Sequence, residues 1–183
     1  SSVYLKAKQF DKEEEMLNRA TKVDSNSILV WYAKARFYQS HKNFEKAEYW
    51  FKKMINSSGE DICFPCMHNN LGYVYKDTRR YDEAEQQFKK VIQLDSTFNN
   101  AYYNLGIVYM ANQRYTDAEQ VYKKLIQLDT NKVDGYMYMG ILYNVSLRYK
   151  ELEQLYKKVI QLDSTFVYGY QELGNLYQNT QRY

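Results

Sequence analysis

The chain has 183 residues, of which 45% are hydrophobic, so it can bury a core and is not a disordered tail. Its 25 Lys and Arg residues nearly balance 22 Asp and Glu residues, and the signs alternate along the chain, which gives no electrostatic case for nucleic-acid binding. Because the sequence has no long apolar run and only two cysteines, we expect a cytoplasmic (intracellular) protein with no membrane contact and no disulfide framework.

A first block of sequence recurs four times along the chain. Its copies are "NNLGYVY" from Asn69, "YNLGIVY" from Tyr103, "YMGILY" from Tyr138 and "ELGNLY" from Glu172. The spacing of 34 residues is kept by two sets of positions, the glycines Gly72, Gly106, Gly140 and Gly174 and the tyrosines Tyr75, Tyr109, Tyr143 and Tyr177. A fixed period of this length is the signature of a repeat architecture.

A second block follows three of these copies with the same period: "YDEAEQQFKKVIQLD" from Tyr81, "YTDAEQVYKKLIQLD" from Tyr115 and "YKELEQLYKKVIQLD" from Tyr149. Its apolar positions fall on one helical stripe and not on alternating strand faces; in the middle copy they are Ala118, Tyr122, Leu125, Ile126 and Leu128. Each repeat is therefore predicted to be two helices, for which Ser96, Thr130 and Ser164 are candidate N-caps or near-caps between repeats. Stacked pairs can share one continuous core that a single pair could not form.

These residues resemble the tetratricopeptide repeat, a family whose 34-residue signature has a bulky residue, Leu-Gly and Tyr in its first helix and Ala with Phe or Tyr in its second. The unit from Asn99 matches it at Tyr102, Leu105, Gly106, Tyr109, Ala118 and Tyr122. The unit from Pro65 matches it at Leu71, Gly72, Tyr75, Ala84 and Phe88. The resemblance implies an all-α fold, a right-handed α-solenoid of stacked antiparallel helix pairs.

The expected organisation is one continuous solenoid, a fragment of a longer array. Residues 1–27 supply mainly the second helix of a partial unit, with Phe10 and Leu17 in register, and 28–64 form a unit with a three-residue insertion within 55–66. Complete units follow at 65–98, 99–132 and 133–166, and residues 167–183 supply the first helix of another partial unit.

The glycines could in principle cradle a phosphate, but such loops need a preceding strand, which the sequence lacks. We expect them to pack helices closely, since glycine within a helix costs about 1 kcal/mol relative to alanine. Cys63 and Cys66 form a C-x-x-C pair, for which a structural or incidental role is favoured over a redox or metal-binding one because no second cysteine pair exists. No catalytic residues, metal or cofactor are expected.

The resemblance also implies where a partner would bind, because tetratricopeptide arrays hold ligands on the concave face lined by the first helix of each unit. Carried over by position, the contact residues are Tyr32, Arg36, Asn69, Asn70, Tyr73, Tyr103, Asn104, Ile107, Tyr138, Ile141, Gln171 and Asn175. The carboxylate-clamp pattern of chaperone-tail binders is absent from these positions. The residues Gly72, Gly106, Gly140, Gly174, Tyr75, Tyr109, Tyr143, Tyr177, Ala84 and Ala118 are expected to be structural.

Three functions fit this sequence. The leading hypothesis is a scaffold or adaptor that binds a peptide or helix of another protein, within a multiprotein complex. The second is the regulatory or substrate-docking array of a larger enzyme, such as a glycosyltransferase, whose catalytic domain lies outside this chain. The third is a building block of a large assembly, with self-association through uncapped solenoid ends.

Overall fold

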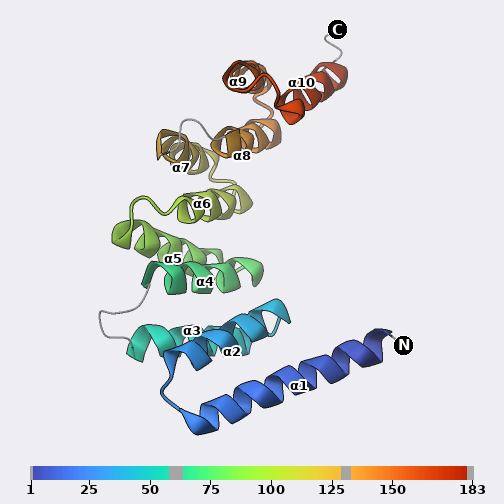
Figure 1. Cartoon of the computed structure of the whole chain (residues 1–183). Coiled ribbons are helices and arrows are strands. Elements are labelled where there is room, and N and C mark those ends of the chain that lie inside the picture. Colours follow the sequence, from blue (N-terminus) through green and yellow to red (C-terminus); the bar gives the residue numbers. More distant parts are fainter. Residues whose placement is uncertain (1, 58–63, 129–132, 181–183) are drawn as a thin grey trace. The chain divides into compact units, whose positions relative to one another are not determined.

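The computed structural model describes residues 2–57, 64–128 and 133–180, and within these ranges it has ten helices and no strand (Figure 1). The expectation of an all-α fold built from helix pairs is confirmed. The chain divides into two compact units, Ser1–Ser96 and Thr97–Tyr183. The structure does not describe residues 58–63 and 129–132. These contain Cys63, Thr130 and half of the segment 55–66 in which the three-residue insertion is expected.

Each unit is a run of antiparallel helices in which every helix packs against the next along the chain. The first unit contains α1 (Ser2–Val23), α2 (Ile28–Ser40), α3 (Phe44–Ser57), α4 (Phe64–Asp77) and α5 (Tyr81–Leu94). The second contains α6 (Asn99–Ala111), α7 (Tyr115–Leu128), α8 (Val133–Val145), α9 (Tyr149–Leu162) and α10 (Val167–Asn179). In the second unit α6 also contacts α8, so consecutive first helices of the repeat lie side by side (Figure 1).

The turn between the two helices of a pair has the same geometry in each complete repeat. One residue adopts a left-handed backbone, with φ between 58° and 60° at Lys42, Arg79, Gln113 and Leu147. The next backbone N–H donates to the tyrosine carbonyl five residues back, at 2.8 Å, as in Arg80 to Tyr75 and Arg148 to Tyr143. This arrangement satisfies the last carbonyls of the first helix and reverses the chain.

Ser96 and Ser164, predicted from the sequence as N-caps or near-caps, are not the N-cap residues of the helices that follow them. The N-cap residues of α6 and α10 are Phe98 and Phe166, and neither makes a side-chain cap hydrogen bond. Before α10 the turn is held instead by Asp163, whose carboxylate accepts hydrogen bonds from the backbone N–H and the hydroxyl of Thr165, at 2.9 and 2.7 Å. The aspartate of the repeated "LDS" segment therefore orders this join rather than Ser164.

The helix pairs pack through a glycine on the first helix and an aromatic ring on the second. A Cβ added at Gly72 would lie 2.7 Å from Cε1 of Phe88, and one at Gly140 would lie 2.9 Å from the hydroxyl of Tyr156. At Gly106 an added Cβ would overlap ring carbons of Tyr122, which is almost fully buried. These three glycines leave room for a ring that any larger residue would displace.

Gly174 departs from this pattern. It is exposed, and an added Cβ would have no heavy atom within 4 Å. The described ranges contain no second helix after α10 to fill the space, so the packing role expected from the repeat register is not realised there. Tyr177, at the position of the buried tyrosines of the other pairs, is likewise only half-buried.

Successive pairs are joined by a cluster of a tyrosine, a glutamate and an arginine. In the second unit the hydroxyl of Tyr143 donates to Glu119 at 3.3 Å, and the guanidinium of Arg148 pairs with the same carboxylate at 2.5 Å. That guanidinium also lies over the Tyr143 ring, 4.5 Å from its centroid. The first unit repeats the cluster with other residues, Tyr75, Glu48 and Arg80.

No helix within the described residues has the length and apolar character that crossing a bilayer would require.

Candidate functional site

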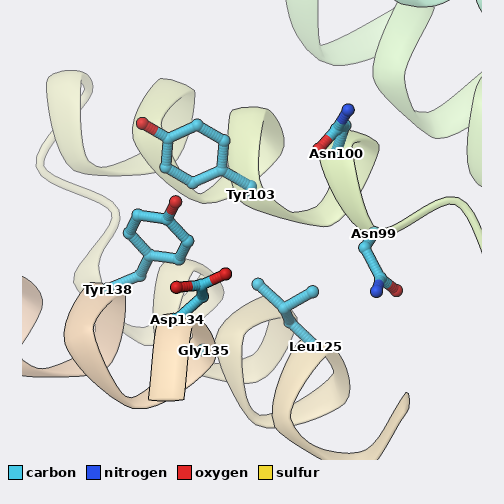
Figure 2. A pocket seen from close by; sticks show the side chains of 7 residues that line it. All are labelled: Asn99, Asn100, Tyr103, Leu125, Asp134, Gly135 and Tyr138. Carbon is cyan, nitrogen blue, oxygen red and sulfur yellow. The ribbon is translucent and has the colours of Figure 1, made fainter. Parts of the chain in front are cut away.

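A cavity of about 230 Å³ lies between the first helices of the second unit. Its walls come from the first two turns of α6 and α8 and from Leu125 of α7, and Figure 2 shows these side chains. The lining residues are Asn99, Asn100, Tyr103, Leu125, Asp134, Gly135 and Tyr138. Two of them, Tyr103 and Tyr138, belong to the set carried over from the repeat signature, and the structure brings them together.

Tyrosine rings form the aromatic part of the cavity. The rings of Tyr103 and Tyr138 lie with their centroids 4.1 Å apart and their planes tilted by 32° (Figure 2). Tyr138 also stacks on Tyr122 of α7, at 6.0 Å and 30°. Burial raises the pKa of Tyr122 well above its ordinary value, and the neighbouring Tyr103 and Tyr138 add to this effect, so its hydroxyl stays protonated. It donates to the sulfur of Met110 at 3.6 Å.

The remaining lining residues give the cavity a polar side. In Figure 2 the carboxylate of Asp134 lies beside the Tyr138 ring, while Asn99 and Asn100 come from the start of α6. Gly135 and Leu125 contribute apolar surface between them. A cavity with aromatic walls and a few polar groups is the usual composition of a site that binds a side chain or small ligand.

The repeat positions assigned from the sequence missed Asp134. The signal was present, because Asp134 holds the second position of the repeat that starts at Val133, the same position as Asn100 in the preceding repeat. Gly135 was missed as well: an added Cβ there would lie 2.8 Å from Cγ1 of Ile126, so this glycine lets α8 approach α7 closely.

Asn104 was expected to face the groove, and this is wrong. It has 0% exposure, and its amide nitrogen donates to the carbonyl of Asn100 at 2.7 Å. Its Oδ1 is buried without a hydrogen-bond partner among the described residues. Burying an oxygen without a hydrogen bond costs free energy, so this atom lowers the stability of the fold.

The other expected contact residues of the second unit remain accessible to different degrees. Ile107 is half-buried and Ile141 is 43% exposed, while Gln171 and Asn175 are exposed on α10. Asn175 donates a long hydrogen bond to Glu172 at 3.4 Å, and both line a smaller cavity of about 50 Å³ beside Tyr156.

In the first unit the expected contacts are less uniform. Tyr32 is 39% exposed, and Arg36 is exposed with its guanidinium donating to Gln39 at 3.1 Å. Arg36 borders an open, mainly apolar cavity of about 590 Å³ between α1 and α2. Its floor includes Met16 and Phe37, which the sequence did not indicate as contacts.

On α4 the two neighbouring asparagines Asn69 and Asn70 are buried, contrary to the expectation that they face the groove. Oδ1 of Asn69 has no hydrogen-bond partner among the described residues. Tyr73 is half-buried, with the ammonium of Lys76 4.3 Å from its ring centroid. Burial lowers the pKa of Lys76, and the nearby Asp77 offsets this only in part.

The cysteines provide no metal centre that the structure describes. Cys66, at the start of α4, is disulfide-bonded, and Cys63 lies outside the described residues. Among the residues that are described, no group of three or more His, Cys, Asp or Glu side chains is placed to hold an ion.

Comparison with known proteins agrees with this architecture. Residues 69–132 match the profile of the tetratricopeptide repeat, which covers part of both units. The solved structure of YrrB, described as a TPR protein with an unusual peptide-binding site, superposes with a TM-score of 0.68 over 93% of this chain and 87% of its own, at 13% identity. The chain is a tetratricopeptide repeat protein.

Two curated proteins share the repeat over part of its length. The Hsp70-Hsp90 organising protein of Plasmodium falciparum is 27% identical over 97 residues, which are 51% of this chain and 17% of that protein. The human protein O-mannosyl-transferase TMTC3 is 29% identical over 79 residues, 43% of this chain and 8% of that protein. The tetratricopeptide chain thus spans less than a fifth of the length of either relative.

Within a tetratricopeptide repeat protein, the cavity has a specific location. Asn99, Asn100 and Tyr103 lie on the first helix of one repeat, and Asp134 and Tyr138 lie on the first helix of the next. The site is therefore formed where two repeats meet on the first-helix face, and no single repeat could form it.

Proposed function

We propose that this chain is a protein-interaction scaffold whose second unit holds a peptide or helix of a partner protein against the first helices α6 and α8. The observation that carries the proposal is the cavity between these helices, in which Tyr103 and Tyr138 meet. Tyrosine gives a large contact area at low conformational-entropy cost and is enriched among residues that dominate binding energy.

The polar groups of the cavity suit a peptide better than a purely apolar ligand. Asn100 is exposed at its edge and can donate to and accept from a peptide backbone, while Asp134 can accept only. YrrB, which shares the fold, is itself described as having a peptide-binding site. The cytoplasmic location stays a prediction.

The test is capture of peptides from a phage-displayed random library by the whole chain, followed by fluorescence anisotropy with the selected peptides. Tyr138→Ala should weaken binding about tenfold or more, since it removes a central aromatic contact. Tyr49→Ala is the matched control, because Tyr49 is an exposed tyrosine on the second helix α3. Equal affinity of both variants for every selected peptide would refute the groove assignment, provided thermal melting shows that both are folded.

A second function is favoured by the match to an O-mannosyl-transferase. In that case the same groove would dock a substrate or a regulatory segment for a catalytic domain carried elsewhere in a longer protein. A catalytic domain fused to this chain should act faster on a substrate that carries a selected peptide than on the same substrate without the peptide. Tyr138→Ala should abolish this difference. A fused substrate that gains nothing would rule out docking as the role of the groove.

A further inference from the structure

The first helices of the second unit carry carboxylates and no cationic side chain. The sequence of α6 has no charged residue, that of α8 has Asp134 alone, and that of α10 has Glu172 alone. The cations of this unit that form ion pairs lie on second helices or on the turns that precede them, as in Arg148 with Glu119 and Lys157 with Glu153. The face that lines the cavity is therefore acidic.

Neither of these carboxylates is neutralised within the part of the chain that the structure describes. No described Lys or Arg forms an ion pair with Asp134, which lines the larger cavity beside Tyr138. Glu172 accepts only the long hydrogen bond from Asn175 and lines the smaller cavity beside Tyr156. Burial, and then the charge of Glu172, raise the pKa of the neighbouring Tyr168. Each carboxylate thus lies next to tyrosines.

Contacts within the chain indicate which group fits between a tyrosine ring and a carboxylate. Three guanidinium groups lie over a tyrosine ring while pairing with a carboxylate. They are Arg148 with Tyr143 and Glu119, Arg80 with Tyr75 and Glu48, and Arg114 with Tyr109 and Asp117. Electron-rich ring faces and carboxylates both attract cations, and the planar guanidinium fits the two together. In the cavity, the Tyr103–Tyr138 pair supplies the rings, and Asp134 supplies a carboxylate that no described Lys or Arg pairs with.

The other ligand classes fit less well. An acidic side chain would meet the Asp134 carboxylate at close range and be repelled. A purely apolar side chain would fill the space between Tyr138 and Leu125 but would leave Asp134 desolvated without a partner, which costs free energy. A cation satisfies the carboxylate and the rings at once.

We propose that the second unit recognises a basic segment of a partner protein by inserting an arginine, or a lysine in its place, between Asp134 and the Tyr103–Tyr138 pair. This inference rests on the proposed function and specifies its ligand. The neutral rim residue Asn100 remains available for the peptide backbone next to the inserted side chain.

The experiment uses the whole chain and the phage-displayed library. Peptides whose capture depends on Tyr138 are sequenced, and one of them is synthesised with citrulline, the neutral isostere, in place of its arginine. Arg or Lys should be enriched at one position, and citrulline should weaken binding to the wild type about fivefold, the size of an exposed ion pair with its cation–π contact. The Asp134→Asn variant should discriminate less between the two peptides than the wild type does, because only the contact with the tyrosine rings then favours arginine. Asp117→Asn is the control, since Asp117 lies on α7 and pairs with Arg114.

Failure of this inference is distinguishable from failure of the proposed function. Peptides that depend on Tyr138 but lack a basic residue, or that bind Asp134→Asn as tightly as the wild type, would overturn the inference and leave the groove as a binding site. A library that yields no Tyr138-dependent peptide would overturn both. Unchanged thermal melting of Asp134→Asn and Tyr138→Ala is required in each comparison.

Discussion

Gly106→Leu should destabilise the second unit because the space beside Gly106 already holds the ring of Tyr122. Even a single added Cβ would overlap Cε1 and Cζ of that ring and lie 2.8 Å from its hydroxyl oxygen. The ring has little freedom to move, since Tyr122 is 1% exposed and stacks on Tyr138. The effect of the substitution is therefore governed by overpacking.

Two opposing contributions set the magnitude. Overpacking of a well-filled core costs about 1–3 kcal/mol, and a leucine places three more carbons beyond the Cβ, so we take the upper value of about 3 kcal/mol. Replacing a helical glycine by leucine recovers about 0.8 kcal/mol of helix propensity. The net loss in the free energy of unfolding is then about 2 kcal/mol.

Gly174→Leu is the matched control, because it makes the same change at the same repeat position of the same unit. An added Cβ at Gly174 has no heavy atom within 4 Å, so only the propensity gain remains and stability should rise by up to about 1 kcal/mol. Urea unfolding followed by far-UV circular dichroism measures both variants. A Gly106→Leu variant as stable as Gly174→Leu would refute the packing explanation. Combining Gly106→Leu with Tyr122→Leu should recover about 1 kcal/mol through coupling of the two sites.

Two further substitutions test other contacts. Partial burial alone would raise the pKa of Glu119, but hydrogen bonds from Lys123 and Arg148 outweigh burial and lower this pKa. These ion pairs therefore stabilise the fold at pH values above the ordinary carboxylate pKa, and their stabilisation is lost as the pH falls through the lowered pKa. Glu119→Gln should lower the free energy of unfolding by about 1–2 kcal/mol near pH 7 and leave it unchanged in acid. Urea unfolding of the wild type and the variant at both pH values measures this difference, and a difference that does not shrink in acid would contradict the prediction. Asn104→Leu should stabilise the fold by about 1 kcal/mol, and so raise the melting temperature, because it removes the buried Oδ1 that has no described partner. A lower melting temperature would show that the amide stabilises the fold.

The helix pairs could be predicted from the sequence because their determinants repeat. The 34-residue spacing of Gly72, Gly106 and Gly140 places each glycine opposite the aromatic ring of the following helix, Phe88, Tyr122 or Tyr156. Each such contact is local, within one pair of helices, so the one-dimensional pattern carries nearly all the information that specifies it. Gly174 shows the limit, because its partner helix is absent from the described residues.

The site could be predicted only in part, because it depends on how helices rotate against one another. Tyr103 and Asn104 are adjacent in sequence and were both assigned to the groove, yet Tyr103 lines the cavity and Asn104 is fully buried. Adjacent helical residues differ by about 100° in direction, so a modest rotation of α6 decides which one is accessible. The cavity also depends on the packing of Tyr103 against Tyr138, two side chains 35 positions apart on different repeats, whose arrangement no repeat consensus encodes.

Glu119 and Asp134 present the same chemical combination, a carboxylate near a tyrosine, for which we propose a stabilising role at Glu119 and a recognition role at Asp134. Both carboxylates lie near a tyrosine, but Glu119 is paired with Arg148 and Lys123 of the chain itself, whereas Asp134 has no described cationic partner. Removing the charge of Glu119 therefore breaks an existing pair. Removing the charge of Asp134 breaks none, so Asp134→Asn should leave the free energy of unfolding within about 0.5 kcal/mol of the wild type while weakening capture of basic peptides. A loss of stability comparable to that of Glu119→Gln would show that Asp134 is a structural residue, and the acidic face would then lose its role in binding.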